Sequence, residues 1–73
     1  SLTTIVQMVA NGIGTTLLPQ MATDAGIAEG TDLVLRPFDE PDVGRQIGLM
    51  WRKKTPRKHE FNLLGAFIQS CLN

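Results

Sequence analysis

The sequence has one cysteine and one histidine, and each scarcity excludes a class of site. One cysteine cannot form an internal disulfide, so the chain is not a disulfide-stapled domain. The single histidine, His59, has no Asp, Glu or Cys at the spacing of a metal-ligand set, so no metal site is predicted. No apolar run reaches the roughly 18 residues that a membrane span requires. The sequence therefore predicts no metal, no cofactor and no membrane segment.

The chain is short and electrically balanced, with 73 residues, 7 of them basic and 7 acidic. A chain of this length buries only about 60% of the surface that its unfolded form exposes, so a single core would be marginal. The first residue, Ser1, is neither an initiator methionine nor part of a basic signal-peptide flank. We therefore expect a piece of one small soluble domain, cut from a longer chain.

The charges are distributed unevenly along the chain. Residues 1–32 carry acidic side chains and no basic one, whereas residues 52–58 hold a compact basic cluster. A nucleic-acid interface could have this composition, but a basic cluster between a strand and a helix is more typical of a solvated connector. The cluster is therefore not taken to predict DNA contact.

Residues 2–11 are predicted to form a helix. Ser1 is a favourable N-cap, and Gly12 stands where a helix commonly ends in a left-handed conformation. The apolar residues between them follow the spacing of one buried helical face: Leu2, Ile5, Val6 and Val9.

Two short elements are expected next. The run 15–18 is β-branched and apolar without alternation, which is typical of a strand buried on both faces. Gly14 bounds this run on one side, and Pro19 follows it. Pro19 is also suited to the first position of a short second helix, which Gly26 can end.

The second half of the chain predicts two strands separated by an acidic loop. Residues 33–38 form the first of them, and residues 39–42 are too polar to be anything but a solvent-facing loop. Residues 45–51 alternate, which predicts a strand with one set of side chains on each face. The two sets are Ile47, Leu49 and Trp51 on one side, and Gln46, Gly48 and Met50 on the other.

A last helix is expected after Thr55 and Pro56, which suit the N-cap and the first turn. Its apolar stripe must pack on a sheet, and comprises Phe61, Leu64, Phe67, Ile68 and Cys71. On that stripe Cys71 is expected to be a small buried thiol that reacts slowly with peroxide.

The predicted order is helix, strand, helix, strand, strand, helix, which is an α/β pattern without its opening strands. So few short strands cannot cover the faces of three amphipathic helices. We therefore expect an incomplete sheet whose remaining partners lie in sequence outside this chain.

The start of the first helix is the strongest candidate for a ligand site. Ser1, Thr3 and Thr4 place hydroxyls beside the free N–H groups of a first turn, where a carboxylate, a phosphate or a peroxide-like ligand can bind. The alternative is a plain helix cap. The pair Gly12 and Gly14 does not begin a nucleotide fingerprint, because position 17 is leucine and the pair follows a helix.

Several segments together resemble the C-terminal part of the regulatory domain of LysR-type transcriptional regulators. The chain is most similar to the OxyR-like, hydrogen-peroxide-responsive branch of that family. The similar segments are Ser1-Leu2-Thr3-Thr4, residues 6–14, Leu17-Leu18-Pro19, residues 24–27 and Arg45-Gln46-Ile47-Gly48-Leu49.

The resemblance implies a two-lobed, periplasmic-binding-protein-like (type 2) α/β domain with an effector cleft between the lobes. Residues 1–44 would close lobe II, and residues 45–73 would form the return strand and C-terminal helix of lobe I. A DNA-binding winged helix-turn-helix would lie at the missing N-terminus. The implied partners are DNA, a small effector or peroxide, a second copy in a dimer or tetramer, and RNA polymerase.

The resemblance also implies roles for particular residues. Ser1, Leu2, Thr3 and Thr4 would lie at the cleft with Arg45 and Ile47. Gly12, Gly14 and Pro19 would shape the turns. For Arg45, a planar, always charged guanidinium could hold an anion or lock the lobes, or it could pair with the nearby Asp42 at the surface. The redox cysteine pair of the branch would lie upstream of Ser1, and Cys71 matches neither member.

The sequence thus predicts the effector-sensing part of a cytoplasmic, peroxide-responsive, LysR-type regulator, and not an enzyme. Two alternatives stay open. One is a LysR-type regulator that senses a small organic acid. The other is a solute-binding protein or an enzyme of the same fold, because a fold does not fix a function.

Overall fold

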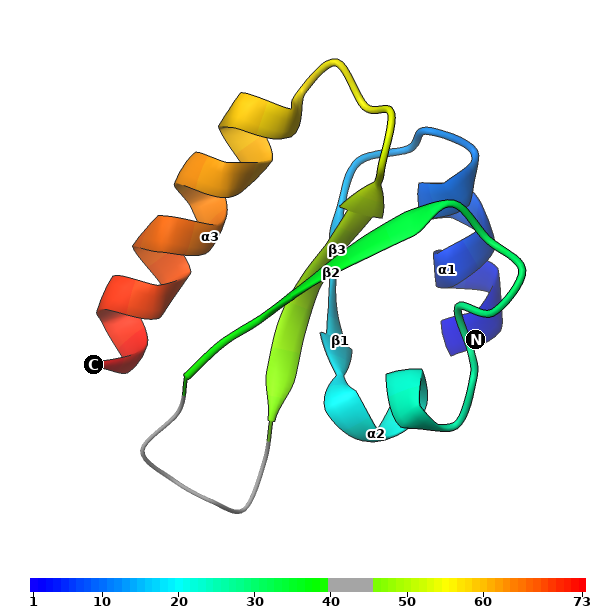
Figure 1. Ribbon diagram of the computed structural model, residues 1–73, viewed down its shortest axis with the longest axis horizontal. Coiled ribbons are helices and arrows are strands. Elements are labelled where there is room, and N and C mark those ends of the chain that lie inside the picture. Colours follow the sequence, from blue (N-terminus) through cyan, green and yellow to red (C-terminus); the bar gives the residue numbers. More distant parts are fainter. Residues whose placement is uncertain (40–45) are drawn as a thin grey trace.

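A computed structural model describes residues 1–39 and 46–73 of the chain. The elements follow the predicted order (Figure 1). They are α1 (Leu2–Ala10), β1 (Thr16–Pro19), α2 (Gln20–Asp24), β2 (Leu33–Pro37), β3 (Ile47–Arg52) and α3 (Lys58–Leu72). The predicted α/β class is confirmed, and the sheet is small and open.

The three strands form one antiparallel sheet in the order β1-β3-β2. The last strand in sequence is therefore the central one. Leu49 lies opposite Leu17 of β1 on one side and Arg36 of β2 on the other. Because β3 has a hydrogen-bonded neighbour on each side and a helical layer on each face, its side chains are the best buried of the three strands.

The sheet lies between two helical layers, with α3 on one face and α1 and α2 on the other (Figure 1). The predicted alternation is confirmed within residues 47–51, because Ile47, Leu49 and Trp51 enter one cluster and Met50 enters the other. The α3-side core comprises Phe38, Leu49, Trp51 and Phe61, with Val34, Ile47, Ile68 and Leu72 packed against it. The α1-side core comprises Val6, Leu18 and Met50, with Leu2, Ala22, Ile27, Ala28, Leu33 and Leu35 around it.

The first strand differs from the prediction. It was expected to be buried on both faces, but β1 lies at an edge of the sheet, where Leu18 is fully buried and Leu17 is 49% exposed. Pro19 ends this strand and caps α2 in an extended conformation instead of opening the helix. Proline is tolerated there because an edge strand can lose one N–H donor.

The last helix also begins later than predicted. Its N-cap is Arg57, because residues 55–57 form a turn in which the Arg57 N–H donates to Thr55 Oγ1 (3.2 Å). At its far end, Gln69 accepts a hydrogen bond from the Asp39 N–H (2.9 Å) and donates one to the Asp39 carbonyl (2.8 Å). These bonds tie the end of β2 to α3.

Several large apolar side chains stay exposed, as expected for a sheet that cannot cover three helices. Leu64 and Phe67 are among them, so only Phe61 and Ile68 of the stripe predicted to pack on a sheet do so, together with Leu72. Among residues 1–39 and 46–73, no helix is long and apolar enough to cross a membrane. The exposed apolar side chains are Ile5, Met8, Ile13, Leu17, Met21, Leu63, Leu64 and Phe67.

Candidate functional site

The start of α1 carries the hydroxyl groups that the sequence singled out. Ser1 caps the helix, since its Oγ accepts a hydrogen bond from the Thr4 N–H (3.3 Å) and lies 3.0 Å from Thr4 Oγ1. Both side chains are exposed, as is that of Thr3. The helix itself is anchored one turn later by Val6, which packs with Leu18 and Met50 of the sheet, and Val9 is buried as well. The first turn is thus fixed in place while its polar groups face outward.

This first turn has donors to offer a ligand. The Leu2 and Thr3 N–H groups have no hydrogen-bond partner within the described part of the chain, and the Leu2 side chain packs into the α1-side core. Free N–H groups at a helix start attract negative charge, and the two neighbouring hydroxyls can each donate or accept. This arrangement can bind a small oxygen-rich ligand. The same hydrogen bond between Ser1 and Thr4 is also what an ordinary helix N-cap makes.

The predicted turn residues lie at two other places. Gly12 and Gly14 have φ values of +90° and +66° and lie in the segment after α1, at the end opposite Ser1. Pro19 lies on β1, paired with Ile47 of β3. The Gln20 N–H then donates to the Gln46 carbonyl (2.8 Å), so α2 starts directly beside the entry to β3.

Ile47 and Arg45 do not join the first turn of α1 in the described structure. The Ile47 side chain packs in the α3-side core, on the face of the sheet opposite to α1. Arg45 lies outside the described residues, as does Asp42, its proposed surface partner. A role for either Arg45 or Ile47 in effector binding therefore stays a prediction.

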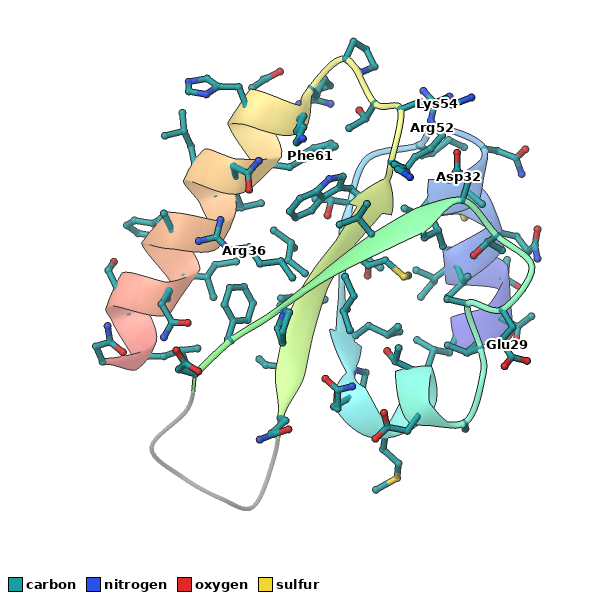
Figure 2. The ribbon with its side chains drawn as sticks, in the orientation of Figure 1. Glu29, Asp32, Arg36, Arg52, Lys54 and Phe61 are labelled. Carbon is teal, nitrogen blue, oxygen red and sulfur yellow. The ribbon has the colours of Figure 1, made fainter. Side chains whose placement is uncertain are left out.

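The sequence analysis did not single out Arg36, which lies on the face of the sheet that α3 covers. Arg36 reaches from β2 to α3, where its Nη1 donates to the Asn62 carbonyl (2.9 Å) and to Asn62 Oδ1 (3.3 Å) (Figure 2). Gly65 makes room for it, because a Cβ at that position would lie 2.8 Å from Arg36 Nη1. The sequence did contain one indication, because Gly65 falls in the middle of the predicted last helix, and a glycine there usually makes room for a neighbouring group.

The expected burial of Cys71 is wrong. The thiol is exposed near the end of α3, because the turn of the helix that faces the sheet there is occupied by Ile68 and Leu72. His59 is exposed as well. Within residues 1–39 and 46–73, no three His, Cys, Asp or Glu side chains gather at a spacing that could hold a metal ion.

We expect Cys71→Ser to change the free energy of unfolding by less than about 0.5 kcal/mol, since an exposed thiol packs against little. Urea unfolding of the full-length protein that contains this chain measures the change. If the protein responds to peroxide, the response should persist in this variant, because the chain offers Cys71 no second cysteine. A lost response with unchanged stability would contradict this and make Cys71 the sensor.

The family comparison covers nearly the whole chain, since the LysR substrate binding domain model matches residues 1–72. Three similar proteins carry the name "Probable hydrogen peroxide-inducible genes activator". That of Mycobacterium avium is 40% identical over 100% of this chain and 23% of its own length. That of Streptomyces viridosporus is 35% identical over 97% of this chain and 23% of its own length.

A further relative is the HTH-type transcriptional regulator EstR of Acinetobacter baylyi, 36% identical over 88% of this chain and 21% of its own length. The chain thus spans less than a quarter of each of these relatives. The match over residues 1–72 is what assigns the family. This chain belongs to the LysR substrate binding domain family.

Proposed function

We propose that this chain is the effector-sensing part of a LysR-type transcriptional regulator that responds to hydrogen peroxide. The observation that carries the proposal is the family match over residues 1–72. The peroxide assignment draws on three relatives of 35%, 40% and 38% identity that are named hydrogen peroxide-inducible genes activators. In this proposal the chain senses a signal and performs no catalysis of its own.

DNA contact belongs to another part of the longer protein. The name of EstR, an HTH-type transcriptional regulator, supports a helix-turn-helix outside the matched segment. The basic residues around 52–58 act as a connector, since Lys53 and Lys54 are exposed between β3 and α3 and Arg57 pairs with Glu60. The proposed partners are DNA, a second copy of the protein in a dimer or tetramer, and RNA polymerase, and the proposed compartment is the cytoplasm.

We place the chain in a two-lobed domain, with residues 1–44 in lobe II and residues 45–73 returning to lobe I. β3 would be this return strand, and it is hydrogen-bonded to both β1 and β2, so the return to lobe I would begin inside the sheet that β1 and β2 form. A shift at the start of α1 would reach β3 through Val6 and Met50, which share one cluster. Effector binding at Ser1–Thr4 and lobe packing would be coupled through that contact.

The peroxide response is tested by DNA binding of the full-length protein. The protein is exposed to hydrogen peroxide, or separately to a panel of small organic acids, and its binding to its own promoter DNA is measured with and without a thiol reductant. Peroxide should change the affinity or the footprint, and the reductant should reverse the change. A response to an organic acid alone would replace the peroxide proposal by reversible effector recognition, and DNA binding without any response would contradict both.

The first turn of α1 is tested by removing its hydroxyl groups. The variant Ser1→Ala/Thr4→Val is expected to lose the effector response while unfolding about 1 kcal/mol more easily, the usual contribution of an N-cap. Gln7→Ala, exposed on the same helix beyond the first turn, should leave the response unchanged. A normal response in the double variant would reduce Ser1 and Thr4 to a helix cap.

A further inference from the structure

A cavity of about 430 Å³ lies between β2, the end of β3 and the first turns of α3. Its size is within the range of small-molecule sites, which is about 300 to 1,000 Å³. It faces α3, so it lies on the side of the sheet opposite to the first turn of α1. The residues that decide its chemistry are Val34, Arg36, Trp51, Lys53, Lys58 and Asn62.

The cavity has a cationic rim. Arg36, Lys53 and Lys58 come from β2, the segment after β3, and α3, and all three line the same space. Among residues 1–39 and 46–73, the one ion pair is that of Arg57 with Glu60, so no described carboxylate is paired with Arg36, Lys53 or Lys58. Three positive groups around a concave, partly desolvated surface attract an anion more strongly than they would in water.

The Arg36 guanidinium is fixed in place and still has donors for a ligand. Its Nη1 is fixed by the carbonyl and the side chain of Asn62, whereas its Nε and Nη2 form no hydrogen bond within the described residues. Gly65 allows the side chain to lie flat against α3, since a Cβ there would come within 3.0 Å of Arg36 Cδ as well. A guanidinium fixed on one side keeps further donors for a planar acceptor such as a carboxylate.

The inner wall of the cavity is apolar. Trp51 is only 3% exposed and packs against Phe61, with ring centroids 6.0 Å apart, and Val34 lies beside this pair in the same core. We propose that the cavity binds a small organic anion that has an apolar body. The anionic group lies against Arg36, Lys53 and Lys58, and the apolar body lies mainly against the half-buried Val34, with the small exposed part of Trp51 behind it. This site is separate from the proposed effector site and does not depend on the peroxide assignment.

Titration calorimetry on the full-length protein tests the proposal with three probes. Phenylacetate has both the charge and the apolar ring, phenylacetamide has the ring without the charge, and inorganic phosphate has the charge without the ring. We expect phenylacetate to bind at least about tenfold more tightly than either of the other two, because each of them loses one of the two contacts. Equal binding of phenylacetate and its amide, or no binding of phenylacetate, would overturn the proposal.

Variants locate the binding. Arg36→Gln should weaken phenylacetate binding by about tenfold or more. Lys53→Gln and Lys58→Gln should each weaken it by about threefold, and these exposed positions do not endanger the fold. Lys54→Gln is the matched control, because Lys54 is an exposed neighbour that does not line the cavity. Figure 2 shows Lys54 and Arg36 well separated on the molecule.

The same variants separate this site from the one at α1. Unchanged phenylacetate affinity in Arg36→Gln, Lys53→Gln and Lys58→Gln, together with a loss in Ser1→Ala/Thr4→Val, would place the ligand at the first turn of α1 and overturn the cavity. The reverse pattern supports the cavity. Neither pattern bears on the peroxide response, so a failure here is distinguishable from a failure of the proposed function.

Discussion

Trp51→Ala is expected to lower the free energy of unfolding by about 4 kcal/mol, the largest effect of any single substitution predicted for this chain. Trp51 is 3% exposed at the centre of the α3-side core, and its ring contacts Phe61, which is itself covered by the Arg57 guanidinium at 5.3 Å. Truncation leaves a cavity that β3 cannot close, because β3 is hydrogen-bonded on both sides. The packing of α3 on the sheet would also weaken, because Phe61 of α3 would lose its contact with the Trp51 ring.

Urea unfolding of the full-length protein, followed by circular dichroism, measures this loss. Trp51→Phe is the control, because it keeps an aromatic ring in place and should cost much less than the alanine variant. Met21→Ala is a second control at an 81% exposed side chain and should cost little. If Trp51→Ala were as mild as Met21→Ala, α3 would not be packed on the sheet as described.

Gly48→Ala is expected to lower the free energy of unfolding by about 3 kcal/mol through overpacking. Gly48 is buried in the central strand, and a Cβ there would lie 2.9 Å from the Arg36 carbonyl oxygen and 2.9 Å from Leu35 Cδ1. The leucine side chain can rotate away, but the carbonyl belongs to the neighbouring strand and can move only if β2 shifts. The β2–β3 pairing should therefore be the part that is lost.

Gly30→Ala is the matched control for this steric argument. Gly30 has φ +76° and nothing within 4 Å of its Cβ position, so alanine there should cost only the backbone strain, about 1 to 2 kcal/mol. Amide hydrogen exchange should show loss of protection along residues 33–37 in Gly48→Ala and not in Gly30→Ala. Equal destabilisation with unchanged exchange along β2 would contradict the clash.

Local sequence patterns predicted every helix and strand because they act over a few residues. The spacing of Leu2, Val6 and Val9 selects a helix, and the alternation in residues 45–51 selects a strand whichever partners are present. The positive φ at Gly12 and Gly26 was predictable for the same reason, since only glycine adopts it without a steric penalty. The hydroxyl cluster at Ser1 and Thr4 is also local, so its geometry followed from the sequence.

Only the tertiary structure decided which strand is central and which side chains meet across the sheet. The order β1-β3-β2 rests on hydrogen bonds between residues that are far apart in sequence, and no local pattern specifies them. That order exposed Leu17 at an edge of the sheet. The packing of α3 on one face put Ile47 in the core away from α1, and the side of α3 that meets the sheet carries Ile68 and Leu72, which leaves Cys71 exposed. The role of Arg36 became visible only where β2 and α3 come together, because a side chain's role depends on what the fold places opposite it.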